Sequence, residues 1–137
     1  MENKRFTRSE ANALLPQLKA DLRQLQQVME QFEDLHTEYQ MTKATYKQAH
    51  KGSMDAQDPF FEMESKLDFM KIETDLLIEN FSRKGVLLKM IKPGLLDFPA
   101  MLDGEEILIC WKEGEDEASH YHGWHDGFIG RKPFPEA

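Results

Sequence analysis

Three histidines lie within six residues near the end of the sequence. His120, His122 and His125 are followed directly by Asp126. On a β-strand, residues two apart point to the same side of the sheet, so His120 and His122 would present their imidazoles together. Two imidazoles at this spacing can bind one transition-metal ion, and His125 or Asp126 from the following turn would add a ligand. The sequence therefore offers a candidate site for a divalent metal such as zinc.

The same histidines have a simpler interpretation, which we favour. Tyr121 and Trp124 alternate with them, as buried aromatic residues alternate with half-exposed polar ones on the outer face of a hairpin. In that arrangement the imidazoles are surface groups with no shared ligand. Acid–base catalysis by the imidazoles without a metal is a third possibility.

A glycine-rich segment that ends in an arginine is the second candidate. Gly127 and Gly130 permit close approach of the backbone, and Arg131 has a planar fork suited to a carboxylate or phosphate. The segment lacks the strand–helix context of a phosphate-binding loop. We therefore expect a turn in which Arg131 pairs with an internal acid such as Asp97 or Asp126.

Cys110 is the single cysteine of the chain, which excludes an intrachain disulfide and fits a reducing cytoplasm. It lies mid-strand with apolar neighbours, so we expect a buried filler and not a nucleophile. Pairing across a turn at Gly114 and Glu115 would place Cys110 opposite Ser119 and beside His120.

Helices are predicted over most of the chain before these residues. Thr7 and Glu10 have the pattern of a capping box, which begins a helix. Pro16 removes a backbone donor, so we expect a short capped helix to about residue 15 and a longer one over 17–49. Apolar residues recur here at steps of three and four, as in the seam of a coiled coil: Leu15, Leu18, Leu22, Leu25, Met29 and Phe32.

A further helix is predicted over 59–84, with Gly52 ending the one before it, Asp58 as its cap and Gly85 closing it. It repeats the seam spacing, so residues 1–85 would form an antiparallel coiled-coil hairpin. A two-helix hairpin has little core of its own. Either the rest of the chain or a second subunit must cover its seams, and we favour a homodimer through the hairpin.

Residues 86–137 have the pattern of a small β-rich head. Apolar strands are indicated over 86–91 and 105–111, and the second is apolar on both faces, so it should be covered twice. A turn over 113–116 would lead into a returning strand over 117–122. The predicted fold class is α+β, mostly α: a long helical hairpin followed by this head.

Charge and hydropathy exclude some classes of function. The net charge is −8, and residues 93–137 carry three basic and ten acidic side chains, which gives −7. Such a head would be repelled by phosphate backbones, so we expect no nucleic acid as partner. No stretch approaches the roughly 18 apolar residues of a membrane span, so we expect no membrane association. The polar N-terminus has no signal-peptide pattern, and we expect a cytoplasmic protein.

Several short motifs together resemble the domain of unknown function 2203 family of short prokaryotic proteins. The matching blocks are Phe6-Thr7, Glu10 to Pro16, Gly85-Val86, Gly94 to Ala100, Ile109 to Trp111, Tyr121-His122 and Gly127 to Pro133. They span nearly the whole chain, and the Leu-Asp-Phe-Pro-Ala and Gly-Phe-x-Gly-Arg blocks are the specific ones. Of the head histidines, only His122 falls on the family pattern. The resemblance implies the architecture and a cytoplasmic setting, and it implies no activity.

The leading functional hypothesis is a binding or assembly module. The hairpin would act as a spacer and dimerisation element, and the head would be a recognition surface for a protein partner. The alternative is a small metal-dependent enzyme, of hydrolase type, that uses His120, His122 and His125. An enzyme needs a concave pocket with convergent polar groups near these histidines, whereas a binding module needs only an exposed surface.

Overall fold

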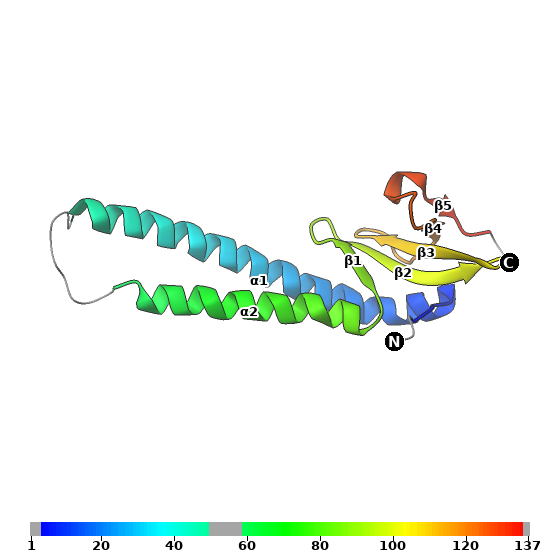
Figure 1. The fold of residues 1–137 in the computed structure, drawn as a ribbon, viewed down its shortest axis with the longest axis horizontal. Coiled ribbons are helices and arrows are strands. Elements are labelled where there is room, and N and C mark those ends of the chain that lie inside the picture. Colours follow the sequence, from blue (N-terminus) through cyan, green and yellow to red (C-terminus); the bar gives the residue numbers. More distant parts are fainter. Residues whose placement is uncertain (1–3, 50–58, 136–137) are drawn as a thin grey trace.

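The computed structural model describes residues 4–49 and 59–135. Helix α1 (Arg8–Ala49) and helix α2 (Phe61–Arg83) pack side by side as a long hairpin, which extends well beyond the head (Figure 1). The head is a five-stranded antiparallel sheet in the order β1-β2-β3-β4-β5. Its strands are β1 (Leu87–Met90), β2 (Leu95–Leu102), β3 (Glu105–Lys112), β4 (His120–His122) and β5 (Lys132–Pro133), with the short helix η1 (Phe128–Gly130) before β5. The predicted fold class is confirmed.

The capping box at the start of α1 is present. The backbone N–H of Glu10 donates to Thr7 Oγ1 at 3.1 Å, and the backbone N–H of Thr7 donates to Glu10 Oε1 at 3.0 Å. Just before it, Phe6 is buried and meets the ring of Phe98 edge-on at 5.3 Å between centroids. The start of α1 is therefore fixed to the sheet as well as capped.

The predicted break at Pro16 is wrong, because α1 runs through this residue as one helix. Proline inside a helix costs about 3 kcal/mol. Leu15 and Leu18, on either side, are almost fully buried, and each buried leucine stabilises by about 1.5–3 kcal/mol. Packing against the sheet therefore outweighs the lost hydrogen bond, and the ring of Pro16 points to solvent.

Helix α2 begins at Phe61, two residues later than predicted, and Gly52 and Asp58 lie outside the described residues. Its end follows the prediction. Gly85 has a φ of 81°, and the N–H groups of Gly85 and Val86 donate to the carbonyls of Ser82 and Phe81, each at 3.0 Å. This pattern, with an apolar contact between residues such as Phe81 and Val86, is a Schellman motif. It turns the chain directly from α2 into β1.

One hydrophobic core joins the hairpin to the head. The inner face of the sheet presents alternate residues of β2 and β3 to the N-terminal half of α1. The core contains Ala11, Leu15, Leu18, Leu22 and Leu25 from α1 and Leu96, Phe98, Ala100, Ile107, Ile109 and Trp111 from the sheet. The head of the same chain therefore covers this half of the α1 seam. Within the described residues, neither helix is long and apolar enough to span a membrane.

Candidate functional site

Three neighbouring strands bring polar residues to one position in the sheet. Asp97 of β2 lies opposite Cys110 of β3, and Cys110 lies opposite His120 of β4. The expectation that Cys110 faces Ser119 is wrong by one residue. The connection between β3 and β4 runs over residues 113–119 and is longer than the predicted turn. Two contacts hold it in place: Trp111 Nε1 donates to the Glu115 carbonyl at 2.8 Å, and Ala118 is buried. A shift of one residue exchanges the two faces of a strand, so His122 shares the face of Cys110.

Asp97, Cys110 and His122 form a compact group, which we call the Asp–Cys–His cluster. One potential ligand atom from each lies within 4.8 Å of the other two, and His122 Nε2 is 3.2 Å from Asp97 Oδ1. Their side chains are buried, with 2%, 0% and 4% of the residue surface exposed. The cluster is on the sheet face opposite α1, where the segment after β4 lies over the strands (Figure 1). The prediction that β3 is covered on both faces is confirmed.

The hydrogen bonds of His122 define its orientation. Nδ1 is 2.8 Å from the carbonyl oxygen of Gly123, and since a carbonyl only accepts, Nδ1 carries a hydrogen. Nε2 then faces the carboxylate of Asp97.

Cys110 is confirmed as a buried residue. Burial raises the pKa of its thiol to about 12, the nearby Asp97 carboxylate adds to this effect, and Arg131 opposes it. The thiol is therefore protonated at neutral pH, which makes it a poor nucleophile as it stands.

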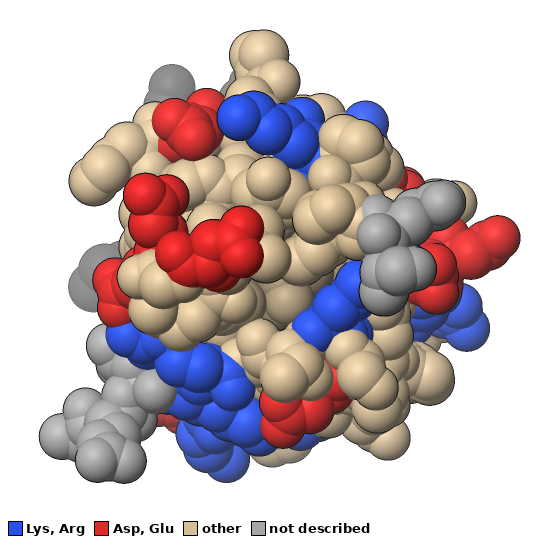
Figure 2. All heavy atoms as spheres, turned by 90° about the vertical axis from the view of Figure 1, so that its right-hand side faces the viewer, with Lys and Arg blue, Asp and Glu red and all other residues tan. Residues whose placement is uncertain are grey.

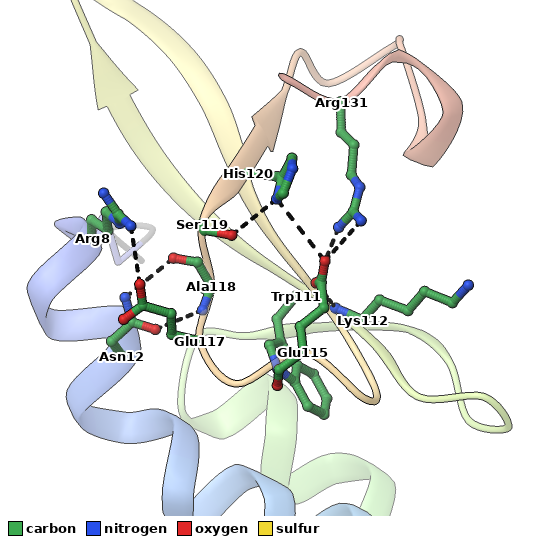
Figure 3. A network of polar contacts seen from close by, with 10 residues as sticks. All are labelled: Arg8, Asn12, Trp111, Lys112, Glu115, Glu117, Ala118, Ser119, His120 and Arg131. Atoms are coloured by element: carbon green, nitrogen blue, oxygen red, sulfur yellow. Dashed lines mark hydrogen bonds and ion pairs between the residues drawn. The ribbon is translucent and has the colours of Figure 1, made fainter. Parts of the chain in front are cut away.

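Arg131 pairs with an internal acid, as expected, but the acid is Glu115 and not Asp97 or Asp126. Its Nη1 and Nη2 donate to Glu115 Oε1 and Oε2 at 3.0 and 2.7 Å (Figure 3). Its guanidinium also lies 4.3 Å from the ring centroid of Phe128. Burial alone would raise the pKa of Glu115, but the hydrogen bonds from Arg131 and from the Lys112 backbone lower it. The fork of Arg131 is thus already occupied by a carboxylate.

Gly127 and Gly130, from the glycine-rich segment before Arg131, have a structural role in the turn that contains them. Gly127 has a φ of 69°, and the N–H of Gly130 donates to the Gly127 carbonyl at 3.2 Å. A Cβ on Gly130 would lie 3.0 Å from the Cβ of Asp126. Gly127 therefore supplies a backbone conformation, and the close approach that Gly130 allows is internal to this turn.

The other predicted metal ligands have separate environments. His120 Nδ1 is 3.0 Å from Ser119 Oγ and 4.0 Å from Glu115 Oε2 (Figure 3). His125 is exposed, and Asp126 Oδ2 accepts from the Gly123 backbone at 3.1 Å. Within the described residues, the acidic, histidine and cysteine side chains that converge as a group of three are those of the Asp–Cys–His cluster. His122 is therefore the one predicted ligand in the cluster, and Asp97 and Cys110 are not among the predicted metal ligands.

Residues 4–134 match the family model described as an uncharacterized conserved protein, DUF2203. The chain belongs to this family. Comparison with curated proteins and with solved structures found no match. All three residues of the cluster fall within the motif blocks by which this DUF2203 member resembles its family.

The acidic head of this DUF2203 member is partly neutralised by basic residues from the start of the chain. Arg5 pairs with Glu106, Arg8 Nη2 is 3.3 Å from Glu117 Oε1, and Lys19 Nζ donates to the Asp116 carbonyl at 3.0 Å. Viewed from the head end, acidic and basic side chains surround an uncharged centre, and neither sign covers this face (Figure 2). Charge counted along the sequence therefore overstates the acidity of this surface.

A second surface of interest lies on the hairpin. Four large apolar side chains of α2, which we call the α2 stripe, are between 53% and 71% exposed: Phe61, Phe69, Ile72 and Leu76. At 100° per residue they share one side of the helix, opposite the side on which Leu67 and Phe81 are buried. Exposed large apolar side chains that share one side of a helix mark a candidate site of interaction.

Proposed function

We propose that this protein is a cytoplasmic assembly module in which a second copy of the chain packs on the α2 stripe. The observation that carries the proposal is the stripe itself, because its side chains are more than half exposed among the described residues and three of them have the spacing of a coiled-coil seam. Phe69, Ile72 and Leu76 follow one another at steps of three and four, and Phe61 lies about two turns before Phe69 on the same side of the helix.

The pattern is self-complementary when the two copies of α2 run antiparallel. Phe69 then meets Ile72 of the second copy, and each contact occurs twice about the two-fold axis. Lys66 lies beside Glu73 of the second copy, so opposite charges flank the seam on one side. On the other side Asp68 lies beside Asp75 of the second copy, so like charges repel on that side alone.

A parallel pair is less favourable. It would place Asp68 beside Glu73 of the second copy on both sides of the seam, where like charges repel. The antiparallel arrangement also has a functional consequence. Because each head follows the end of α2, an antiparallel dimer carries one head at each end of the spacer. Two partners could then be held apart at a fixed distance.

The mass of the purified full chain in solution tests the proposal. We expect twice the chain mass of 16.0 kDa by light scattering or sedimentation. Ile72→Glu should give a monomer. Ile78→Glu is the matched control, because Ile78 is a partly exposed isoleucine on another side of the same helix and should leave the dimer intact. A wild-type monomer, or a dimer broken by Ile78→Glu and not by Ile72→Glu, would rule out this surface.

Charge reversal tests the orientation of the pair. Lys66→Glu should weaken the dimer by placing like charges beside Glu73, and Lys66→Glu with Glu73→Lys should restore it. If the double variant is no tighter than Lys66→Glu alone, the antiparallel register is wrong.

The alternative of a metal-dependent hydrolase on His120, His122 and His125 stays a prediction. It needs three converging imidazoles. His125 is exposed and His120 faces Ser119, so the geometry favours it less than it favours an assembly module.

A further inference from the structure

We propose that Asp97, Cys110 and His122 bind a divalent transition-metal ion of the zinc class inside the head. This site is separate from the α2 stripe and does not depend on the proposed assembly. It also differs from the ligand set that the sequence suggests, because His122 is shared but His120 and His125 are not.

The distances suit a small tetrahedral ion. Zinc bonds of about 2.0–2.3 Å place neighbouring nitrogen, oxygen and sulfur ligands roughly 3.3–3.6 Å from one another. His122 Nε2 and Asp97 Oδ1 are 3.2 Å apart, and the Cys110 ligand atom lies within 4.8 Å of both. A small movement of the thiol completes three of the four tetrahedral positions.

His122 is already oriented as a ligand. Metal-bound histidines almost always donate their second ring N–H to a carboxylate or a backbone carbonyl, which fixes the ring and the tautomer. Here Nδ1 donates to the Gly123 carbonyl at 2.8 Å, and Nε2 points into the cluster. This is the arrangement in which Nε2 offers its lone pair to a metal.

Charge balance favours the ion. Cys110 would bind as a thiolate, so its thiol proton leaves as the dication enters. The dication then neutralises one thiolate and one carboxylate, and the buried site has no net charge. Arg131, which is close to the thiol, is itself balanced by Glu115.

The donor atoms indicate which ions fit. A thiolate and an imidazole favour zinc and similar borderline ions, and they discriminate against magnesium and calcium, which prefer oxygen ligands. Because Cys110 and His122 are 0% and 4% exposed, an ion bound here would exchange slowly with solvent. A structural role in holding three strands together follows from that burial.

Metal content of the full chain is the first test. Purified protein is incubated with zinc, desalted and analysed for metal by plasma mass spectrometry. We expect about one equivalent in the wild type and less than about a tenth of one in Cys110→Ser. His120→Gln and His125→Gln are the matched controls and should retain the ion. Well under one equivalent in the wild type, or loss in either control, would overturn the site.

Cobalt spectroscopy of the wild type is the second test, and it does not require a variant to fold. Cobalt(II) bound through Cys110 should give a thiolate-to-metal charge-transfer band in the near ultraviolet. Bound cobalt without this band would show that Cys110 is not a ligand. The solution mass of Cys110→Ser, measured alongside, should stay that of the wild type, so failure of the metal site is distinguishable from failure of the assembly.

Discussion

The guanidinium of Arg131 and the carboxylate of Glu115 meet at two points, at 3.0 and 2.7 Å, across the outer edge of the head (Figure 3). Glu115 also accepts the backbone N–H of Lys112 at 2.8 Å. The contact therefore joins the end of β3 to the segment that follows η1. Arg131 is also close enough to Cys110 to oppose the rise in the pKa of its thiol, so the ion pair lies beside the Asp–Cys–His cluster.

We expect Arg131→Ala to lower the free energy of unfolding by about 1.5–3 kcal/mol, since hydrogen bonds to charged groups are lost and Glu115 is left unpaired. Arg131→Lys should recover only part of this loss, because an ammonium group cannot reproduce the planar fork. Urea denaturation followed by circular dichroism measures both variants. An unchanged midpoint for Arg131→Ala would mean that the pair contributes nothing to the stability of the head.

The carboxylate of Asp21 makes the hairpin less stable at acid pH. Its Oδ2 accepts from Lys84 Nζ at 2.7 Å and from Asn80 Nδ2 at 3.0 Å, and its Oδ1 accepts from Gln17 Nε2 at 2.9 Å. Burial would raise the pKa of Asp21, but these hydrogen bonds, led by that from Lys84, lower it. A lowered pKa in the folded state gives stability that is complete above the ordinary value of about 4 and is lost as pH falls through the folded value.

Asp21→Asn should therefore cost about 1–3 kcal/mol at pH 7 and progressively less below pH 4. The measurement is urea denaturation of wild type and variant at pH 7, 5 and 3. Gln24→Ala, on an exposed position of the same helix, serves as a control and should leave the pH dependence unaltered. Equal differences between Asp21→Asn and wild type at all three pH values would contradict the assignment.

Gly94 of the head packs directly against Leu22 of α1. A Cβ at this position would lie 2.1 Å from Cδ2 of Leu22, which is too close for any atom pair. We expect Gly94→Ala to destabilise by about 1–3 kcal/mol, as overpacking does in a dense core. Leu22→Ala removes the obstructing side chain, so the double variant should lose less stability than the sum of the two single variants. Strict additivity would show that Gly94 and Leu22 do not interfere.

Local signals in the sequence were sufficient for much of the fold. The capping box of Thr7 and Glu10, the glycine after α2 and the two-sided apolar pattern of β3 each depend on neighbouring residues, and each is confirmed. The predicted break at Pro16 is wrong because the effect of this residue depends on the burial of Leu15 and Leu18 against a sheet far away in the sequence.

The Asp–Cys–His cluster could not be found by the same reasoning. Asp97, Cys110 and His122 come from three strands, and their meeting depends on the pairing register of β3 and β4. An error of one residue in that register puts His122 on the wrong face. The length of the connection before β4, which fixes the register, is set by tertiary contacts. Among these are the two hydrogen bonds between Asn12 and Ala118, at 2.7 and 3.2 Å.

Pro16 gives the last prediction, because the structure retains a residue that weakens its own helix. Replacing it by alanine restores an N–H that can donate to the carbonyl four residues earlier and removes the clash of the ring. The gain is about 3 kcal/mol in the folded state, and the greater freedom of the unfolded chain offsets roughly 0.4–1 kcal/mol of it. Pro16→Ala should therefore raise the free energy of unfolding by about 2 kcal/mol in urea denaturation.

The matched control is Ala20→Pro, which places a proline at another exposed position of α1. It should lower the free energy of unfolding by about 3 kcal/mol or more. If Pro16→Ala leaves stability unchanged while Ala20→Pro lowers it, the backbone at residue 16 has adapted to the ring, and the proline is not a source of instability. A fall in stability with Pro16→Ala would mean that the ring itself makes contacts that stabilise the start of α1.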